Sequence, residues 1–107
     1  MNHVTVKDLQ KLKNLVSFSA TQLEKLAASL FIKTFKKHEI VFDQDEEAKL
    51  IYFALSGIVR VSYIHSYQRQ TIVSLLATGE FFGIDSLIPQ AHHAFRCEAF
   101  DDCRIVH

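Results

Sequence analysis

The sequence predicts a mainly β fold, a sandwich or a barrel, with two short helices before the first strand. Three observations support this prediction. Apolar residues recur at helical spacing as far as Leu30, and from Phe31 onward they alternate with a period of two. Many short apolar runs then follow at close spacing, separated by turn residues, which is typical of sandwiches and barrels. With 107 residues and 49% apolar side chains, the chain has material for one domain with one core.

The first helix is expected over residues 4–16. Leu9, Leu12 and Val16 stand at helical spacing, and charged residues lie between them. An apolar stripe of this kind normally faces a core, while the charged residues face solvent.

The second helix has a better-defined start. Ser19 and Gln22 have the spacing of a capping box, in which each side chain accepts a hydrogen bond from a free amide of the first turn. Phe18 and Leu23 occupy the two positions of a hydrophobic staple around that cap. The apolar face of this helix, which we expect to pack on the core, contains Leu23, Leu26, Ala27 and Leu30.

Strands are expected where apolar and polar residues alternate or where short apolar runs occur. They cover residues 31–35, 40–42, 50–55, 58–64, 71–76, 95–100 and 103–106. Turns at 36–39, 43–47, 56–57, 66–69 and 77–79 separate the first six of them. Within 58–64, Val59, Val61 and Tyr63 are expected to share one face of the strand. The last two strands are expected to form a hairpin around Asp101 and Asp102.

Composition and charge argue against several classes of function. Twelve basic and twelve acidic residues give a formal net charge of zero, so the chain has no general attraction for the phosphate backbone of DNA. No apolar run approaches the ~20 residues of a membrane span, and the N-terminus lacks the apolar core of a secretory signal. Cys97 and Cys103 do not make a disulfide framework and are expected to be small core residues. We therefore expect a cytoplasmic protein that does not bind membranes.

Three segments, taken in order, carry a family resemblance. They are residues 12–19, residues 51–61 (Ile-Tyr-Phe-Ala-Leu-Ser-Gly-Ile-Val-Arg-Val) and residues 79–87 (Gly-Glu-Phe-Phe-Gly-Ile-Asp-Ser-Leu). They resemble the entry helix, the central hairpin and the pocket segment of the CRP/FNR superfamily of bacterial transcription regulators. The resemblance covers about residues 12–107 and implies a double-stranded β-helix, or jelly roll. It identifies residues 1–107 as a cyclic-nucleotide-binding-like sensory domain.

The chain ends at His107, within the last expected strand. Because a final strand needs an exit and partners for its edge, we expect the sequence to be a piece of a longer protein. By resemblance, a long dimer helix and a helix-turn-helix domain that binds DNA would follow residue 107.

Three turn positions at which the family commonly has glycine hold His38, Asp45 and Gln68 in this chain. Histidine and aspartate tolerate left-handed backbone better than most residues. The first two substitutions are therefore mild, whereas Gln68 indicates a reshaped turn.

The resemblance also places the ligand pocket, whose candidate residues are Gly83, Ile84, Asp85, Ser86, His93 and Ala94. A nucleotide-binding member has a glutamate after the second glycine for the ribose, and an arginine followed by serine or threonine for the phosphate. Here those positions hold Ile84, His93 and Ala94. Isoleucine and alanine side chains form no hydrogen bonds, and a neutral histidine lacks the permanent, bidentate charge of arginine. We therefore expect no response to cyclic AMP.

The run Gly83-Ile84-Asp85, with His92, His93 and Phe95, resembles the oxygen-responsive fumarate-and-nitrate-reduction (FNR) branch more closely. That branch senses through an iron–sulfur cluster held by cysteines near the N-terminus. This chain has no cysteine before Cys97, so the resemblance does not extend to that chemistry.

Histidines raise a metal hypothesis, which the spacing argues against. His92 and His93 are adjacent and would point to opposite faces of a strand, and no His-x-His of the kind that cupin enzymes need occurs. A haem sensor would use one axial histidine, with His93 as the candidate, but the sequence supplies no second ligand. The simpler interpretation, which we favour, is that both histidines lie at a polar loop edge. We expect no metal and no cofactor.

No phosphate loop, nucleophile elbow or pair of carboxylates is present, so we expect no enzyme activity. The favoured function is that of a sensory and dimer-contact domain of a CRP/FNR-type regulator, responding to an unidentified small molecule or to none. The full protein would be a homodimer that binds DNA through another domain. The alternative is a stand-alone module that regulates a partner enzyme or channel.

Overall fold

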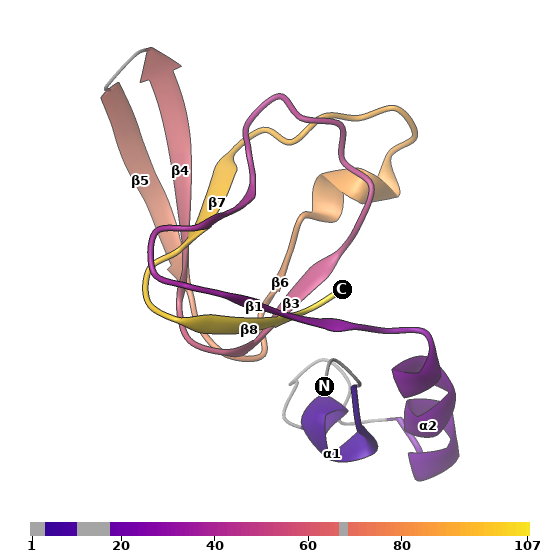
Figure 1. Cartoon of the computed structure of the whole chain (residues 1–107). Helices are drawn as coiled ribbons and strands as arrows, with labels where there is room; N and C mark the ends of the chain where they lie inside the picture. Colours follow the sequence, from indigo (N-terminus) through magenta and orange to yellow (C-terminus); the bar gives the residue numbers. More distant parts are fainter. Residues whose placement is uncertain (1–3, 11–17, 67–68) are drawn as a thin grey trace.

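The computed structural model describes residues 4–10, 18–66 and 69–107, and these form two antiparallel sheets of four strands each (Figure 1). The first sheet has the order β1 (Ile32–Phe35), β8 (Cys103–Val106), β3 (Tyr52–Ser56) and β6 (Phe81–Phe82). The second has the order β2 (Ile40–Phe42), β7 (Arg96–Ala99), β4 (Val59–Ser66) and β5 (Arg69–Leu76). The mainly β, jelly-roll fold expected from the sequence is therefore confirmed.

The described part of the chain contains two apolar cores. The first lies between the sheets and is formed by Phe35, Phe42, Ala54, Val59, Val61, Phe82, Cys97, Ala99, Cys103 and Ile105. The second lies between the first sheet and the helices and is formed by Val4, Leu9, Leu23, Ile32, Phe53, Leu55 and Val106. Because β3 contributes to both cores, both its faces are buried, which explains its uninterrupted apolar sequence.

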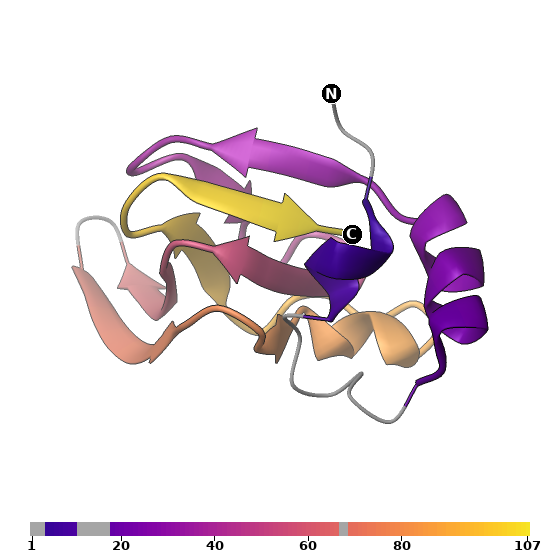
Figure 2. The ribbon, with the colours of Figure 1, turned by 90° about the horizontal axis from the view of Figure 1, so that it is seen from below.

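The second helix follows its sequence signals closely. α2 (Ala20–Ala28) begins after Ser19, whose hydroxyl accepts a hydrogen bond from the amide of Gln22, and the Gln22 side chain accepts one from the amide of Ser19. Leu23 is buried, as expected, whereas Phe18 is 41% exposed. Figure 2 shows α2 at the end of the sandwich where the short 3-10 helix η2 (Ile84–Leu87) lies.

The first helix is described over only part of its expected span. α1 (Val6–Leu9) starts at Thr5 with a second capping box, and Leu9 is buried. Leu12 and Val16, which were expected to continue its apolar stripe, lie outside the described residues. Neither α1 nor α2 is long and apolar enough to cross a membrane.

The expected hairpin of the last two strands is wrong. β7 pairs with β2 and β4, whereas β8 pairs with β1 and β3, so the chain crosses from one sheet to the other at residues 100–102. The carboxylate of Asp101 accepts a hydrogen bond from the amide of Ile58 at 2.7 Å, and that of Asp102 accepts one from the amide of Lys37 at 2.9 Å. These aspartates therefore tie the crossover to two other turns.

The expected alternation along the fourth strand is correct for its first half only. Val59 and Val61 are buried, but the register with β5 shifts between Val61 and Ser62. The extra residue at this irregularity is Val73 of β5, because the register of β4 with β7 continues unbroken from Val61 to Ser62. Ser62, on the face opposite Val61, is nevertheless fully buried, and Tyr63, expected on the inner face, is 42% exposed.

Left-handed backbone occurs at two of the three turns where the family commonly has glycine. His38 has φ of 75° and Asp45 has φ of 70°, so the interpretation of these substitutions is confirmed. Gln68 lies outside the described residues. Gln90, with φ of 62°, is a further left-handed position that the sequence did not reveal.

Candidate ligand pocket

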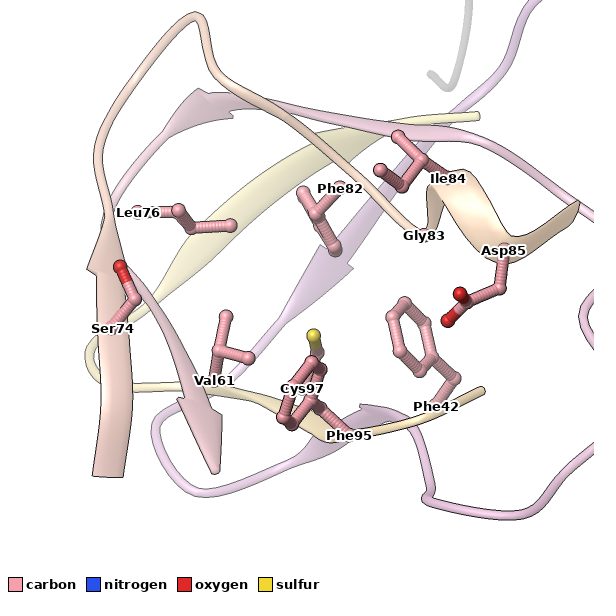
Figure 3. A pocket seen from close by; sticks show the side chains of 10 residues that line it. All are labelled: Phe42, Val61, Ser74, Leu76, Phe82, Gly83, Ile84, Asp85, Phe95 and Cys97. Atoms are coloured by element: carbon pink, nitrogen blue, oxygen red, sulfur yellow. The ribbon is translucent and has the colours of Figure 1, made fainter. Parts of the chain in front are cut away.

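A pocket of about 290 Å³ lies between the two sheets, beside the start of η2. Its lining consists of Phe42, Val61, Ser74, Leu76, Phe82, Gly83, Ile84, Asp85, Phe95 and Cys97 (Figure 3). Most of these side chains are apolar, and Asp85 is the only charged one. The chemistry of the pocket is therefore that of an apolar cavity with a carboxylate at one side.

The wall formed by the second sheet is a single row of side chains across four strands. Ser74 of β5 pairs with Val61 of β4, Val61 pairs with Cys97 of β7, and Cys97 pairs with Phe42 of β2. Residues paired across strands present their side chains on the same face of a sheet. Sequence reasoning missed all four, because only the pairing of distant strands brings them together.

The opposite wall depends on Gly83. This residue follows β6 and has φ of 77°, in the left-handed region. A Cβ atom placed on it would lie 2.9 Å from Cδ2 of Tyr52 and 3.1 Å from the carbonyl oxygen of Leu50. Backbone angle and space thus both require glycine here, and the turn it makes sets η2 at the edge of the pocket.

Asp85 joins η2 to the chain before β7. Its Oδ2 accepts a hydrogen bond from the amide of Ala94 at 3.1 Å and lies 3.9 Å from Nδ1 of His93. The carboxylate remains about one third exposed. In Figure 3 it points toward the pocket beside the ring of Phe42, so a bound molecule could reach it.

His93 does not lie at a polar loop edge, and that prediction is wrong for this residue. Its side chain is 2% exposed and its ring stacks on Phe42, with the ring centroids 3.6 Å apart. Its amide and carbonyl bond to the backbone of Glu46 and Asp45, which fixes the segment against the loop after β2. His92, by contrast, is exposed, so the two histidines do face opposite ways.

The buried ring of His93 is poorly suited to carry charge. Nδ1 has no hydrogen-bond partner among the described residues. Burial lowers the pKa of His93, and the nearby carboxylates of Asp85 and Glu46 only partly oppose this effect. Phe42, rather than His93, forms the wall of the pocket.

The six candidate residues therefore have different positions. Gly83, Ile84 and Asp85 line the pocket, with Ile84 62% exposed at its rim. Ser86 lines a neighbouring groove between η2 and α2 instead. Ala94 is exposed and meets Asp85 only through its backbone amide.

The arginines nearest to the pocket in sequence are bound elsewhere. Arg96, in β7, contacts Asp43 through Nε at 2.8 Å, and Arg60, in β4, contacts Glu98 at 2.8 Å. The hydrogen bond to Arg96 lowers the pKa of Asp43, which keeps that pair charged. No lysine or arginine among the described residues lines the pocket, so it offers an anion no counter-charge.

Cys97 points its sulfur toward the pocket but is chemically quiet. Burial raises the pKa of its thiol to about 12, so almost none is present as the reactive thiolate at neutral pH. Cys97 and Cys103 are both free and buried, as expected, and they lie in different sheets. Among the described residues, no group of three or more His, Cys, Asp or Glu side chains could hold a metal ion.

The fold and pocket can now be set beside known proteins. Residues 32–107 match the model of the cyclic nucleotide-binding domain family. The chain belongs to this family. A cyclic nucleotide-binding domain is a regulatory unit.

Individual relatives of this cyclic nucleotide-binding domain are distant. Over 57 residues it is 30% identical to the Global nitrogen regulator of Nostoc sp. (strain PCC 7120), a match that covers 53% of this chain and only 26% of that protein. The sensor domain of the transcriptional regulator DNR from Pseudomonas aeruginosa superposes with a TM-score of 0.78 at 20% identity, covering 94% of this chain and 67% of that one.

The same fold occurs in a protein of another regulatory class. The regulatory subunit of a cAMP-independent protein kinase A from Trypanosoma brucei superposes with a TM-score of 0.84 at 17% identity. The match covers 94% of this chain and 37% of that one. At this identity the likeness concerns the fold alone.

Proposed function

We propose that this domain is the sensory part of a bacterial CRP/FNR-type transcription regulator, closer to the FNR branch, and that it does not respond to cyclic AMP. It works in the cytoplasm, needs no cofactor, touches no membrane and catalyses no reaction. The similarity to the nitrogen regulator and to a regulator's sensor domain supports the role in transcription.

The observation that carries the loss of cyclic-nucleotide response is the charge at the pocket. Among the described residues, Asp85 is the only charged side chain that lines the pocket, and the nearby Arg60 and Arg96 already pair with Glu98 and Asp43. A cyclic phosphate placed there would face a carboxylate with no cation to balance either charge. Like charges in a partly dry site repel strongly, so the phosphate would stay in water.

The fifth strand provides a route from the pocket to a dimer partner. On β5, Ser74 and Leu76 line the pocket, while Leu75 and the neighbouring Val73 are each 50% exposed and do not line it. Apolar side chains in such a row suit the side of a long helix. A ligand that displaces β5 would therefore move a dimer helix following residue 107, and with it the DNA-binding domains.

The function is tested with the longer protein that the proposal requires. We expect it to enrich one sequence from a pool of random DNA at about 150 mM salt, whereas residues 1–107 alone enrich none. A helix-turn-helix encoded after residue 107 would agree with this result. An enzyme or channel segment there, with no DNA enrichment, would favour the alternative of a module that regulates a partner protein, for which the kinase-subunit fold is a precedent.

A further inference from the structure

The size of the pocket limits what it can hold. A dry cavity of about 150 Å³ lined by leucine, isoleucine and phenylalanine accepts benzene. At about 290 Å³, this pocket has nearly twice that volume, enough for two fused rings. The aromatic residues Phe42, Phe82 and Phe95 supply surfaces on which a flat ring can stack.

The polar groups of the pocket limit its ligand further. Oδ2 of Asp85 is held by the amide of Ala94, and the structure shows no partner for Oδ1 among the described residues. Figure 3 shows Ser74, the other polar side chain, across the pocket from Asp85. A buried or half-buried carboxylate is best satisfied by a charged hydrogen-bond donor.

We propose that the pocket binds a small arylalkylamine, an aliphatic ammonium group attached to about two fused aromatic rings, with the ammonium group on Asp85 and the rings against the phenylalanines. The inference rests on the proposed sensory function and names the chemistry of its ligand. An amine gives Asp85 the cation that no side chain of the described pocket supplies. An aromatic acid of the same shape would set two carboxylates against each other.

Tryptamine and indole-3-acetate make a matched pair of probes, because they share the indole rings and carry opposite charges. The protein has no tryptophan, so indole fluorescence reports the bound probe without background from the chain. We expect saturable binding of tryptamine to residues 1–107, at least ~10-fold tighter than that of indole-3-acetate, with neutral indole between them.

Three variants locate the effect. Asp85→Asn should weaken tryptamine binding ~10-fold and leave indole nearly unchanged, because the amide keeps the acceptor for Ala94 but loses the charge. Glu24→Gln makes the same carboxylate-to-amide change on the exposed side of α2 and should alter nothing. Val61→Phe should abolish binding of all three probes by filling the pocket, with thermal unfolding showing that the variant is folded.

Three results would overturn the inference: no saturable binding of any probe, equal or tighter binding of the acid, or an unchanged amine preference in Asp85→Asn. None of them bears on the DNA selection with the longer protein. Failure of the ligand inference is therefore distinguishable from failure of the proposed regulatory role.

Discussion

The ring of His93 lies flat against the ring of Phe42, with 3.6 Å between centroids and 13° between planes. At the position that the family resemblance assigns to a phosphate-binding arginine, this chain thus has a packed core side chain. The stack supports the wall of the pocket from behind, because Phe42 lines the pocket and His93 does not. It also makes stability depend on the protonation of His93.

Acidification should destabilise the domain. Burial lowers the pKa of His93 in the folded state, whereas the unfolded chain keeps an ordinary value of about 6.5. Below that value the unfolded state therefore binds more protons than the folded state. The contribution of His93 to the free energy of unfolding is fully present above about pH 6.5 and is lost as the pH decreases. Urea unfolding between about pH 7.5 and about pH 5.5 measures this.

Variants identify the group responsible. His93→Gln should reduce the loss of stability on acidification, and the exposed His92→Gln should not. Part of the loss should remain, because burial and the charge of Lys33 also lower the pKa of His107. An identical pH dependence in wild type and His93→Gln would show that the buried ring is not the source.

Gly→Ala substitutions should destabilise the domain to different extents, depending on which atoms the new Cβ contacts. Gly57 and Gly83 both have positive φ, so Gly→Ala introduces strain of ~1–3 kcal/mol at each. At Gly57 the new atom collides with the backbone carbonyl of Asp102, whereas at Gly83 the nearest atom is in the Tyr52 side chain. We expect a lower unfolding midpoint for Gly57→Ala than for Gly83→Ala, and the reverse order would contradict the crossover geometry.

Neither cysteine should react in the folded protein. Both are buried, and the pKa of the Cys97 thiol is raised to about 12. Iodoacetamide at neutral pH should leave both unmodified in buffer and alkylate both in urea, as read by mass spectrometry. Rapid labelling of Cys97 in buffer would mean that the pocket opens widely or that the thiol is ionised.

The outer face of β5 should control assembly. Val73 and Leu75 are exposed, and a helix following residue 107 is expected to cover them. Residues 1–107 should be monomeric or weakly associated, whereas a chain longer by about 30 residues should form a stable dimer. Val73→Ser with Leu75→Ser should weaken that dimer without unfolding the exposed strand. Light scattering measures the mass of each species. If residues 1–107 alone form a tight dimer and the longer chain does not strengthen it, the outer face of β5 is not the surface that controls assembly.

Local signals predicted local structure well. The capping box of Ser19 and Gln22 and the strands β2 and β8 follow from residues close in sequence, and the family resemblance indicated left-handed backbone at His38 and Asp45. Strand pairing did not follow, because the contacts that send β7 and β8 to different sheets join residues far apart in sequence, such as Asp101 and Ile58.

The pocket shows the same limit. The segment 79–87 indicated its edge, since Gly83 and Asp85 stand in a recognisable turn. The wall formed by the second sheet, the row from Ser74 to Phe42, depends on the register of four strands, including the shift in the pairing of β4 with β5 after Val61. His93 was misplaced for a related reason, because a histidine in a polar run gives no sign that a phenylalanine from β2 will cover it.

Calorimetry of cyclic AMP and cyclic GMP with residues 1–107 tests the central claim most directly. Asp85 is the only charged side chain that the described residues place in the pocket, and no lysine or arginine among them lines it, so we predict no heat of binding for either nucleotide at micromolar concentration. A micromolar dissociation constant for either one would contradict the account of the pocket.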